Sequence, residues 1–251
     1  RLLVVPVPNK ESIYPEMLTQ RARGMRTVVC PQTRRLLKQL KVSGVEVVDL
    51  FEVFQDAKRA QGQSSGQPLY LAQDSHWSPT GVELAAKAVA KRMVENGWLD
   101  KGTVEYDERP VRLRRLGDVV EMLQSPQIER QVGPQEIVCA QVVRRDTGIV
   151  YEDDPDSEVL VVGDSCLRIY ERDEPRGAGF IAHLARQLRQ PLTSIVNDGG
   201  ASTLVRQQLY RHPGLLENKK VVIWEFVERD IAFGTEGWRL VPLPPVSSVE
   251  E

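Results

Sequence analysis

Residues 157–170 read "SEVLVVGDSCLRIY": an apolar run leads into Gly-Asp-Ser, and a segment that can turn helical follows. A short valine-rich run of this kind is typical of a strand buried in a parallel sheet. Gly163 allows the backbone to turn sharply, and Asp164 can brace the turn. The pattern therefore predicts a strand, a turn and a helix, with Ser165 at the carboxyl edge of the sheet, where such folds bind ligands.

The rest of the chain repeats this alternation of short apolar runs and helical patterns, which is typical of an α/β fold with a largely parallel sheet. The strand candidates are residues 2–7, 27–30, 45–50, 158–162, 192–196 and 220–226. The helical patterns cover residues 15–24, 33–44, 79–97, 178–190 and 201–212. The helix from 79 is the best marked, because Ser78 suits the N-cap and Pro79 the first helical position.

Residues 98–157 interrupt the alternation with "RPVRLRRLGDVVEML", β-like pieces such as "EIVCAQVVRR" and the acidic run "YEDDPDSE". We interpret this segment as a β-rich insertion in one domain of residues 1–238, followed by a proline-rich tail at 239–251. The basic run at 112–115 alternates with apolar residues, which predicts the solvated face of a strand. The acidic run lacks the ligand spacing of a calcium loop and favours a solvated turn.

Composition excludes several classes of protein. A formal net charge of −2 does not favour a nucleic-acid partner, since phosphate binding needs clustered excess Lys and Arg. The sequence has no run of 18 apolar residues of the kind that spans a membrane. The chain opens on a core strand, "RLLVVPVP", so we expect a preceding segment, with any export signal or anchor, to have been removed.

The three cysteines, Cys30, Cys139 and Cys166, are too few and too scattered for a disulfide framework or a Cys-x-x-Cys metal site. Cys30 and Cys139 each follow a valine in an apolar run, which favours small buried hydrophobic residues. One disulfide plus a free thiol is the alternative.

A second motif, "QDSHWSPTG" at residues 73–81, supplies what a nucleophilic serine lacks. Serine needs a base, and the base needs an orienting acid. Side chains two apart on an extended segment point the same way, so Asp74 can reach one nitrogen of His76 and leave the other for Ser165. The alternative is a capped loop with a structural histidine and an ordinary Gly-Asp-Ser turn. Together the motifs favour a Ser-His-Asp triad.

Other residues near these motifs have two interpretations each. Trp77 either stacks on a sugar ring or anchors the loop in the core. Lys10 and Tyr14 follow the first strand, where α/β folds bind ligands, and are either substrate contacts or a solvated lysine and a packed tyrosine. His183 and His212 fit structural or surface positions.

The sequence predicts neither a metal nor a cofactor. It contains no His-Glu-x-x-His motif and no Cys/His cluster with zinc-ligand spacing. It also lacks the glycine-rich phosphate-binding motifs of nucleotide and dinucleotide sites.

Gly-Asp-Ser after a strand, with Asp-x-His-Trp upstream, resembles the SGNH hydrolase superfamily, and more narrowly the alginate O-acetyltransferases of the AlgJ/AlgX type. Ordinary SGNH esterases carry their Asp and His near the C-terminus, whereas here both precede the serine. "VVPVPNKESIYPE", "DSHWSPTG" and "LGDVVEML" support the narrower match, which runs from about residue 3 to about residue 231.

The resemblance implies an SGNH-like α/β fold and a periplasmic exopolysaccharide O-acetyltransferase. By this analogy Ser165 accepts the acetyl group as an ester, His76 is the general base and acid, Asp74 orients it, and a sugar hydroxyl receives the acetyl. The implied partners are the polysaccharide, a membrane-bound acyltransferase that delivers the acetyl, and other polysaccharide export and modification proteins.

The sequence departs from the family at the oxyanion hole. Cys166 follows the serine where the family usually has an aromatic residue, and no asparagine occupies the usual place near the last strand. Candidate donors toward the oxyanion or substrate are Gly200, Asn197 and Arg229. For Arg229, an ion pair with a neighbouring acid is the alternative.

Two other functions fit the same motifs. An acetylesterase would use the same triad with water as the acceptor. A non-catalytic glycan-binding subunit of an export complex would carry no acetyl chemistry at all.

Overall fold

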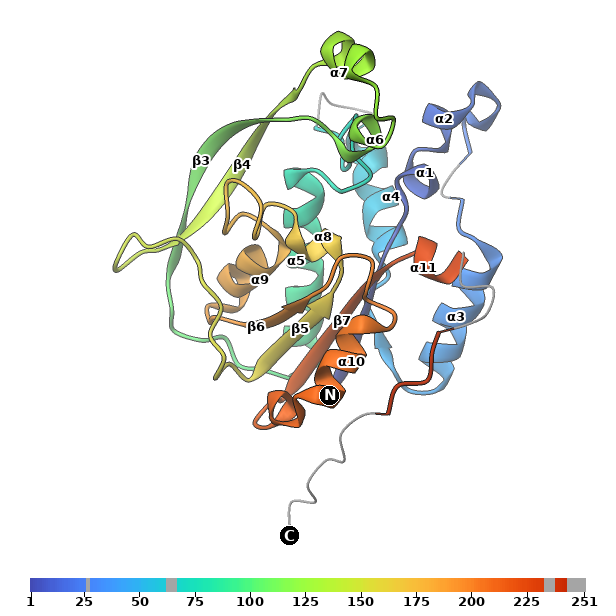
Figure 1. Cartoon of the computed structure of the whole chain (residues 1–251). Coiled ribbons are helices and arrows are strands. Elements are labelled where there is room, and N and C mark those ends of the chain that lie inside the picture. The colour runs from blue at the N-terminus through green and yellow to red at the C-terminus, as the bar shows by residue number, and fades with distance from the viewer. Residues whose placement is uncertain (26–27, 62–66, 233–237, 243–251) are drawn as a thin grey trace.

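Five apolar runs pair in parallel in the computed structural model, which describes residues 1–25, 28–61, 67–232 and 238–242 (Figure 1). Within these residues the strands of the sheet are β1 (Leu2–Val7), β2 (Glu46–Val47), β5 (Val159–Gly163), β6 (Thr193–Val196) and β7 (Val221–Val227). Their order is β2-β1-β7-β5-β6. Parallel strands end at one edge, so the turn after β5 lies where α/β folds bind ligands. The predicted α/β fold is confirmed.

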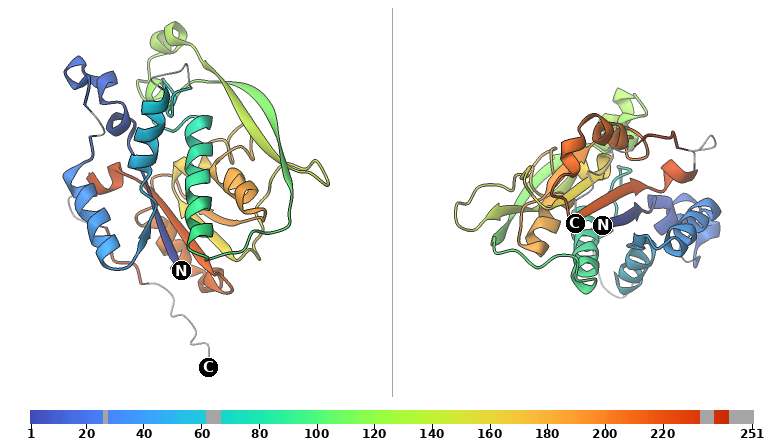
Figure 2. Two further views of the ribbon diagram at one scale, coloured as in Figure 1. Left: turned by 180° about the vertical axis from the view of Figure 1, so that it is seen from behind. Right: turned by 90° about the horizontal axis from the view of Figure 1, so that it is seen from below.

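Helices cover both faces of the sheet, because successive side chains of a strand point to opposite faces. In β1, Leu3 and Val5 belong to the main core, whereas Val4 belongs to a cluster on the other face. The main core includes residues of α4 (Leu50–Gln61), α5 (Pro79–Glu95) and α9 (Phe180–Leu188), and the opposite face packs against α3 (Pro31–Val42) and α10 (Leu204–Arg211). From behind, α4 and α5 lie side by side across the sheet (Figure 2).

A separate antiparallel hairpin lies within the segment predicted as a β-rich insertion. Its elements are β3 (Tyr106–Arg115), α6 (Asp118–Glu121), α7 (Pro126–Val132) and β4 (Gln135–Arg144). Tyr106 pairs with Arg144 and Arg115 with Gln135, so α6 and α7 connect the strands at the Arg115 end (Figure 1). The bounds of the insertion, 98–157, and of the whole domain, 1–238, remain predictions.

Short helical segments complete the described chain. They are α1 (Lys10–Ile13), α2 (Pro15–Leu18), the 3₁₀ turns at Gln20–Ala22 and Pro213–Leu216, α8 (Ser165–Arg168) and α11 (Arg229–Ala232). The single helix predicted over 15–24 is wrong. Thr19 is extended, and its hydroxyl accepts a hydrogen bond from the Arg21 N–H, which starts a new turn.

Two predicted strands are also wrong in extent. Val28 donates its N–H to the Ser12 carbonyl and Cys30 donates to the Glu228 carboxylate, so 28–30 join no ladder; residue 27 lies outside the described residues. In the run 45–50, only Glu46–Val47 pairs with β1, and Leu50 instead begins α4 with its side chain fully buried.

The end of the chain is described only in part. Residues 239–242 adopt no helix or strand, and the rest of the predicted tail, 243–251, lies outside the described residues. Among the helices of the described ranges, none is both long enough and apolar enough to cross a membrane.

Candidate active site

The loop that carries Asp74 and His76 is closed by its own backbone. The Leu71 N–H donates to the His76 carbonyl, and the Ser78 N–H donates to the Leu69 carbonyl. Ser78 is the N-cap of α5, as predicted, and its hydroxyl accepts from the Gly81 N–H at 3.2 Å. The loop is therefore fixed at one end by α5 and presents its side chains at the carboxyl edge of the sheet.

The serine lies on the predicted strand-to-helix turn. Strand β5 ends at Gly163, and Ser165 is the first residue of α8. Asp164 braces the turn: its Oδ1 accepts from the Cys166 N–H at 2.9 Å, and its own N–H donates to Oε2 of Glu225 at 2.9 Å. A Cβ at Gly163 would lie 2.2 Å from that Glu225 oxygen and 3.0 Å from Glu225 Cβ, so a larger residue here would displace the Glu225 side chain that accepts from Asp164.

The two motifs meet, although 89 residues separate His76 from Ser165. His76 Nε2 lies 2.8 Å from Ser165 Oγ, and Nδ1 lies 2.6 Å from Oδ1 of Asp74. Asp74 also accepts from the His76 N–H at 3.0 Å through that oxygen. The Asp74 side chain is fully buried, and Ser165 and His76 are 8% and 5% exposed. This arrangement is that of a serine, a base and an orienting acid.

Arg115 completes the surroundings of Asp74. Its Nε donates to Oδ2 of Asp74 at 3.0 Å, which leaves both carboxylate oxygens hydrogen-bonded. Burial alone raises the pKa of Asp74, but hydrogen bonds from the ring and backbone of His76, then from Arg115, outweigh it and hold this pKa well below its usual value. The carboxylate therefore stays ionised beside the imidazole.

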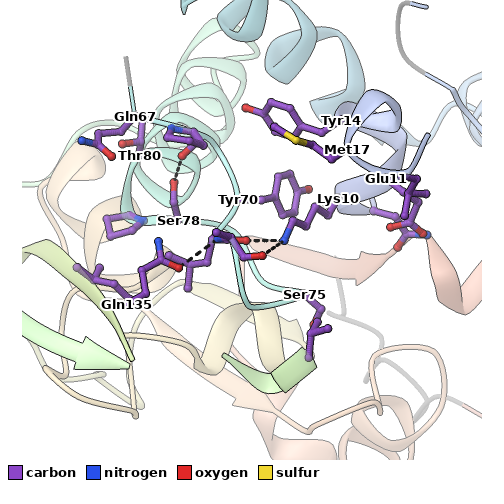
Figure 3. Close-up of a pocket in the computed structure, with 18 of the residues that line it drawn as sticks. Lys10, Glu11, Tyr14, Met17, Gln67, Tyr70, Ser75, Ser78, Thr80 and Gln135 are labelled. Carbon is purple, nitrogen blue, oxygen red and sulfur yellow. Dashed lines mark hydrogen bonds between the residues drawn. The ribbon is translucent and has the colours of Figure 1, made fainter. Parts of the chain in front are cut away.

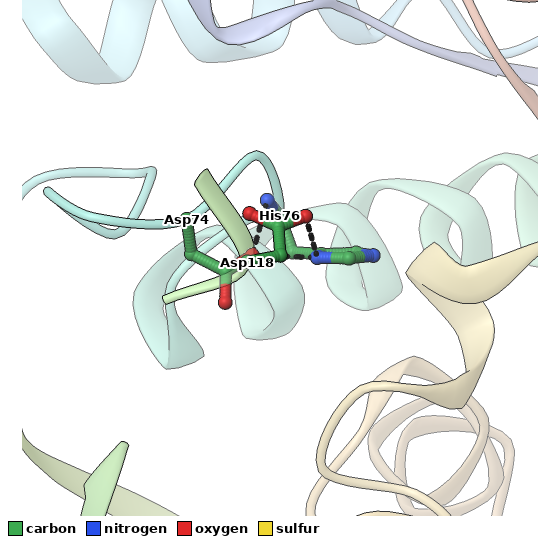
Figure 4. Close-up of side chains that lie close together, drawn as sticks. All are labelled: Asp74, His76 and Asp118. Carbon is green, nitrogen blue, oxygen red and sulfur yellow. Dashed lines mark hydrogen bonds and ion pairs between the residues drawn. The ribbon is translucent and has the colours of Figure 1, made fainter. Parts of the chain in front are cut away.

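Asp118, at the start of α6, also reaches the loop at residues 69–78 that carries Asp74 and His76, here called the catalytic loop. Its Oδ1 accepts from the Ser75 N–H at 2.6 Å, and its Oδ2 lies 3.4 Å from His76 Nδ1. Asp74 and Asp118 thus both lie at the Nδ1 side of the ring and leave Nε2 facing away from them (Figure 4).

Sequence reasoning missed the roles of Arg115 and Asp118. The run 112–115 was predicted as a solvated face, which holds for Arg112 and Arg114 but is wrong for Arg115. Period-two alternation does not show that the last residue of the strand turns inward. The one available signal for Asp118 was the stretch "LGDVVEML", whose resemblance to the family could have marked it.

Trp77 is a core anchor and not a sugar platform. Its side chain is 0% exposed, its ring stacks on Phe180 at 5.8 Å between centroids, and its Nε1 donates to the Cys166 carbonyl at 3.1 Å. A ring without solvent access cannot lie against a glycan, so the sugar-stacking interpretation is wrong.

Lys10 is likewise a structural residue. An ammonium group has three N–H donors. In Lys10 they reach the carbonyls of Leu71, Ala72 and Asp74 at 2.6, 2.9 and 3.2 Å. No donor remains for a substrate, so the predicted substrate contact is replaced by an anchor of the catalytic loop.

A cavity of about 870 Å³ lies beside this loop, with Lys10, Tyr14 and Ser75 among its lining residues (Figure 3). Tyr14 is 9% exposed and its hydroxyl accepts from the Leu69 N–H, so it is a packed tyrosine that also lines the cavity. Its lining residues do not include Ser165 or His76. The cavity therefore adjoins the catalytic loop at Ser75 without including the serine–histidine contact.

The predicted oxyanion donors differ in availability. The Gly200 N–H donates to the Asn197 carbonyl at 2.9 Å, and the Asn197 N–H donates to the Gly163 carbonyl at 3.0 Å. A backbone N–H used in a turn cannot serve an oxyanion, so the assignment of Gly200 is wrong. Arg229 begins α11 and lines the same cavity as Lys10.

Two groups of metal-ligand side chains come within 4.8 Å of one another in the described ranges: Asp74, His76 and Asp118, and Asp164, Cys166 and Glu225. In the first, hydrogen bonds already occupy the carboxylates. In the second, burial raises the pKa of each member. Metal ligands must be deprotonated, so this environment favours hydrogen bonding over ligation.

The remaining histidines and the cysteines occupy structural or surface positions. His183 is buried on α9, with Nδ1 3.4 Å from Glu108 Oε1, and His212 is exposed at the end of α10. All three cysteines are free thiols. Cys139 is buried as predicted, whereas Cys30, for which burial was also predicted, is only partly buried; Cys166 is buried as well.

Gly117 provides a test of how the insertion meets the catalytic loop. A Cβ at this position would lie 2.0 Å from the Gln73 carbonyl oxygen, so one backbone must move. We expect Gly117→Ala to lower kcat about 10- to 100-fold, because a shift of order 1 Å displaces Asp74 and His76. Gly214→Ala is the matched control, because this exposed glycine has no positive φ and an added Cβ would have no neighbour closer than 4.0 Å. Steady-state kinetics would check this, and equal rates for Gly117→Ala and wild type would contradict it.

Comparisons with known proteins identify the family of this chain. The model of the family described as "SGNH hydrolase-like domain, acetyltransferase AlgX" matches residues 1–228. The "Probable alginate O-acetylase AlgJ" of Azotobacter vinelandii is 25% identical over 238 residues, which cover 91% of this chain and 58% of that protein. The protein of the same name from Pseudomonas fluorescens is 24% identical over 247 residues, which cover 94% of this chain and 58% of that protein. The chain thus spans somewhat more than half the length of these curated relatives.

Solved structures show the same fold. The O-acetyltransferase domain of Pseudomonas putida AlgJ superposes with a TM-score of 0.69 at 22% identity, over 92% of this chain and 76% of that one. Pseudomonas aeruginosa AlgX superposes with a TM-score of 0.59 at 16% identity, over 90% of this chain and 52% of that one. Because the family model covers nearly the whole sequence, the chain belongs to the family of SGNH hydrolase-like domains of the acetyltransferase AlgX.

Proposed function

We propose that this chain is an O-acetyltransferase that carries the acetyl group on Ser165 and passes it to a sugar hydroxyl. The observation that carries the proposal is the 2.8 Å contact between His76 Nε2 and Ser165 Oγ, with Asp74 on the opposite ring nitrogen. This geometry supports proton transfer from serine to imidazole during attack on an acyl group.

The reaction has two half-reactions that use the same base. First, Ser165 Oγ attacks the acetyl carbonyl of the donor while His76 takes its proton; the donor's leaving group departs with that proton. Second, a sugar hydroxyl attacks the acetyl-serine while His76 takes its proton and returns it to Ser165 Oγ. Asp74 holds the ring and stabilises the imidazolium in both steps. The side-chain amide of Asn197 and the guanidinium of Arg229 are the remaining candidate donors toward the oxyanion, since the Asn197 backbone N–H already donates to the Gly163 carbonyl.

The substrate and the setting rest on the family and its relatives. Two relatives are named as alginate O-acetylases, so alginate is the polysaccharide we propose first. We place the protein in the periplasm, with a membrane-bound acyltransferase as the source of acetyl groups and other export and modification proteins as partners. The cavity that the catalytic loop lines through Ser75 does not include Ser165, so we place there the neighbouring sugar units of the polymeric acceptor and not the reacting hydroxyl.

An acceptor-partition experiment tests transfer against hydrolysis. We expect a chromogenic acetyl ester to produce an adduct of one acetyl group on Ser165, seen by intact mass and peptide mapping at early times. Oligomannuronate should shorten the life of this adduct and become acetylated, because the sugar hydroxyl outcompetes water. A neutral oligosaccharide of equal length is the control. An adduct that decays at the same rate with either oligosaccharide and releases only acetate identifies an esterase. A wild type that forms no adduct and releases no acetate supports the glycan-binding subunit.

A further inference from the structure

The end of β3 directs one arginine toward the catalytic acid. Arg112 and Arg114 are exposed on this strand, whereas the Arg115 side chain is 21% exposed and contacts two carboxylates. Its Nε donates to Oδ2 of Asp74 at 3.0 Å, and one terminal nitrogen donates to Oδ2 of Asp173 at 3.4 Å. Arg115 thus joins Asp74, which is fully buried, to a carboxylate on another loop.

That second carboxylate is itself held in place. Asp173 accepts hydrogen bonds from Arg168, and Arg168 Nε donates to Oδ1 of Asp198 at 2.9 Å. The alternating charges run from Asp74 through Arg115, Asp173 and Arg168 to Asp198. Arg168 is the last residue of α8, the helix that begins with Ser165. The network therefore connects the loop of the acid to the helix of the nucleophile.

Asp118 fixes the residue between the acid and the base. Its two oxygens accept from the N–H and the hydroxyl of Ser75 at 2.6 and 2.5 Å. Ser75 lies between Asp74 and His76 in the chain, so this clamp sets the backbone that carries both. The 3.4 Å approach of Asp118 to His76 Nδ1 adds negative charge on the same side of the ring as Asp74.

We propose that Arg115 and Asp118 are positioning residues of the reaction, which hold Asp74 and the Ser75 backbone so that His76 stays directed at Ser165. The inference rests on the proposed function and goes beyond it, because it assigns a catalytic purpose to the inserted hairpin. Removal of Arg115 would leave a buried carboxylate oxygen without its cation, and Asp74 would then turn toward solvent or bind a proton.

A positioning role and a purely structural role of Arg115 make different predictions for the pH dependence of the rate. Loss of the Arg115 cation increases the proton affinity of the Asp74–His76 pair, so the acidic limb of the kcat/KM profile moves to higher pH. The groups whose charge also acts on this pair are Lys10 on α1, Asp118 on α6, Asp164 before α8 and Tyr170 after it. A residue that only stabilised the fold would lower activity without moving this limb.

The experiment compares Arg115→Met and Arg115→Lys with Arg114→Met, a matched control from the exposed side of the same strand. With the chromogenic acetyl ester, we expect Arg115→Met to lower kcat about 10- to 100-fold with KM within about twofold, and to move the acidic limb upward. Arg115→Lys keeps the charge but not the two-pronged contact, so it should recover part of kcat and restore the limb. Arg114→Met should match wild type in rate and profile.

Asp118 is tested in the same assay with Asp118→Asn against Glu121→Gln, from the exposed end of α6. Asparagine replaces one of the two acceptor oxygens with an NH₂ donor, so one of the two Ser75 donors would face another donor and the two-oxygen clamp would be lost. We expect about a 10-fold lower kcat for Asp118→Asn and no change for Glu121→Gln.

Thermal unfolding accompanies every variant, and rates are compared only at temperatures where each is folded. A wild-type rate and pH profile in folded Arg115→Met would overturn the inference. It would also be overturned if Arg115→Met had a lower rate with the acidic limb of its kcat/KM profile at the wild-type pH, and Arg115→Lys recovered none of that rate. An Arg115→Met that does not fold leaves Arg115→Lys to decide: a fully wild-type kcat there contradicts the need for the two-pronged contact. Ser165→Ala separates the two proposals: activity surviving in that variant refutes the proposed function, whereas an inactive Ser165→Ala together with a wild-type rate and pH profile in Arg115→Met refutes only the role of Arg115.

Discussion

Ser165→Ala should lower kcat for acetyl-ester cleavage by on the order of 10³- to 10⁶-fold and abolish the acetyl adduct. The hydroxyl is the only atom removed, and its described partner is His76 Nε2. We therefore expect little change in the melting temperature. His76→Ala should cost a similar factor, and the double variant no more than either single one, because the serine and the base act as one unit.

The measurement is initial-rate kinetics with intact mass at early times. Ser43→Ala, at the exposed end of α3, is a matched control that should behave as wild type. Asp74→Asn should lose activity yet also lower stability, because it removes the buried partner of Arg115. Retention of an acetyl adduct by Ser165→Ala would place the nucleophile elsewhere and refute the triad.

The sequence made the meeting of Asp74, His76 and Ser165 predictable because each motif is local. Gly-Asp-Ser and Asp-x-His each occupy a few residues, and the α/β pattern brings sheet-edge turns together. What surrounds the triad was not predictable, because it depends on contacts across long distances in the chain. Arg115 meets Asp74 across 41 residues and Asp118 meets Ser75 across 43, through a hairpin whose docking no periodicity specifies.

The errors in the fold have a similar origin. The apolar run at 45–50 carries no signal that β2 stops after two residues, since tertiary packing decides whether Leu50 continues a strand or begins α4. Lys10 and Gly200 were assigned to ligands from their place at the sheet edge. Both instead satisfy neighbouring backbone groups, which must be paired wherever they are buried.

Trp77→Ala should lower the free energy of unfolding by about 3–5 kcal/mol, the largest loss of stability expected here, because a fully buried indole leaves a cavity. Trp77→Phe keeps a ring against Phe180 but leaves the Cys166 carbonyl without its donor, at a cost of about 1–3 kcal/mol. Trp98→Ala, at a partly buried tryptophan, is the control and should cost less. Chemical denaturation measures all three.

The same variants decide between the two interpretations of an aromatic residue next to His76. A sugar platform would increase KM for the glycan and leave stability unchanged. A core anchor does the opposite: Trp77 links the loop of His76 to the carbonyl of Cys166, beside Ser165, so its loss loosens the serine–histidine contact. In folded Trp77→Phe we therefore expect kcat to fall by about 10-fold with KM for the glycan within about twofold. A stable Trp77→Phe with a raised KM and an unchanged kcat would instead mean that the indole meets the substrate after a rearrangement of the loop.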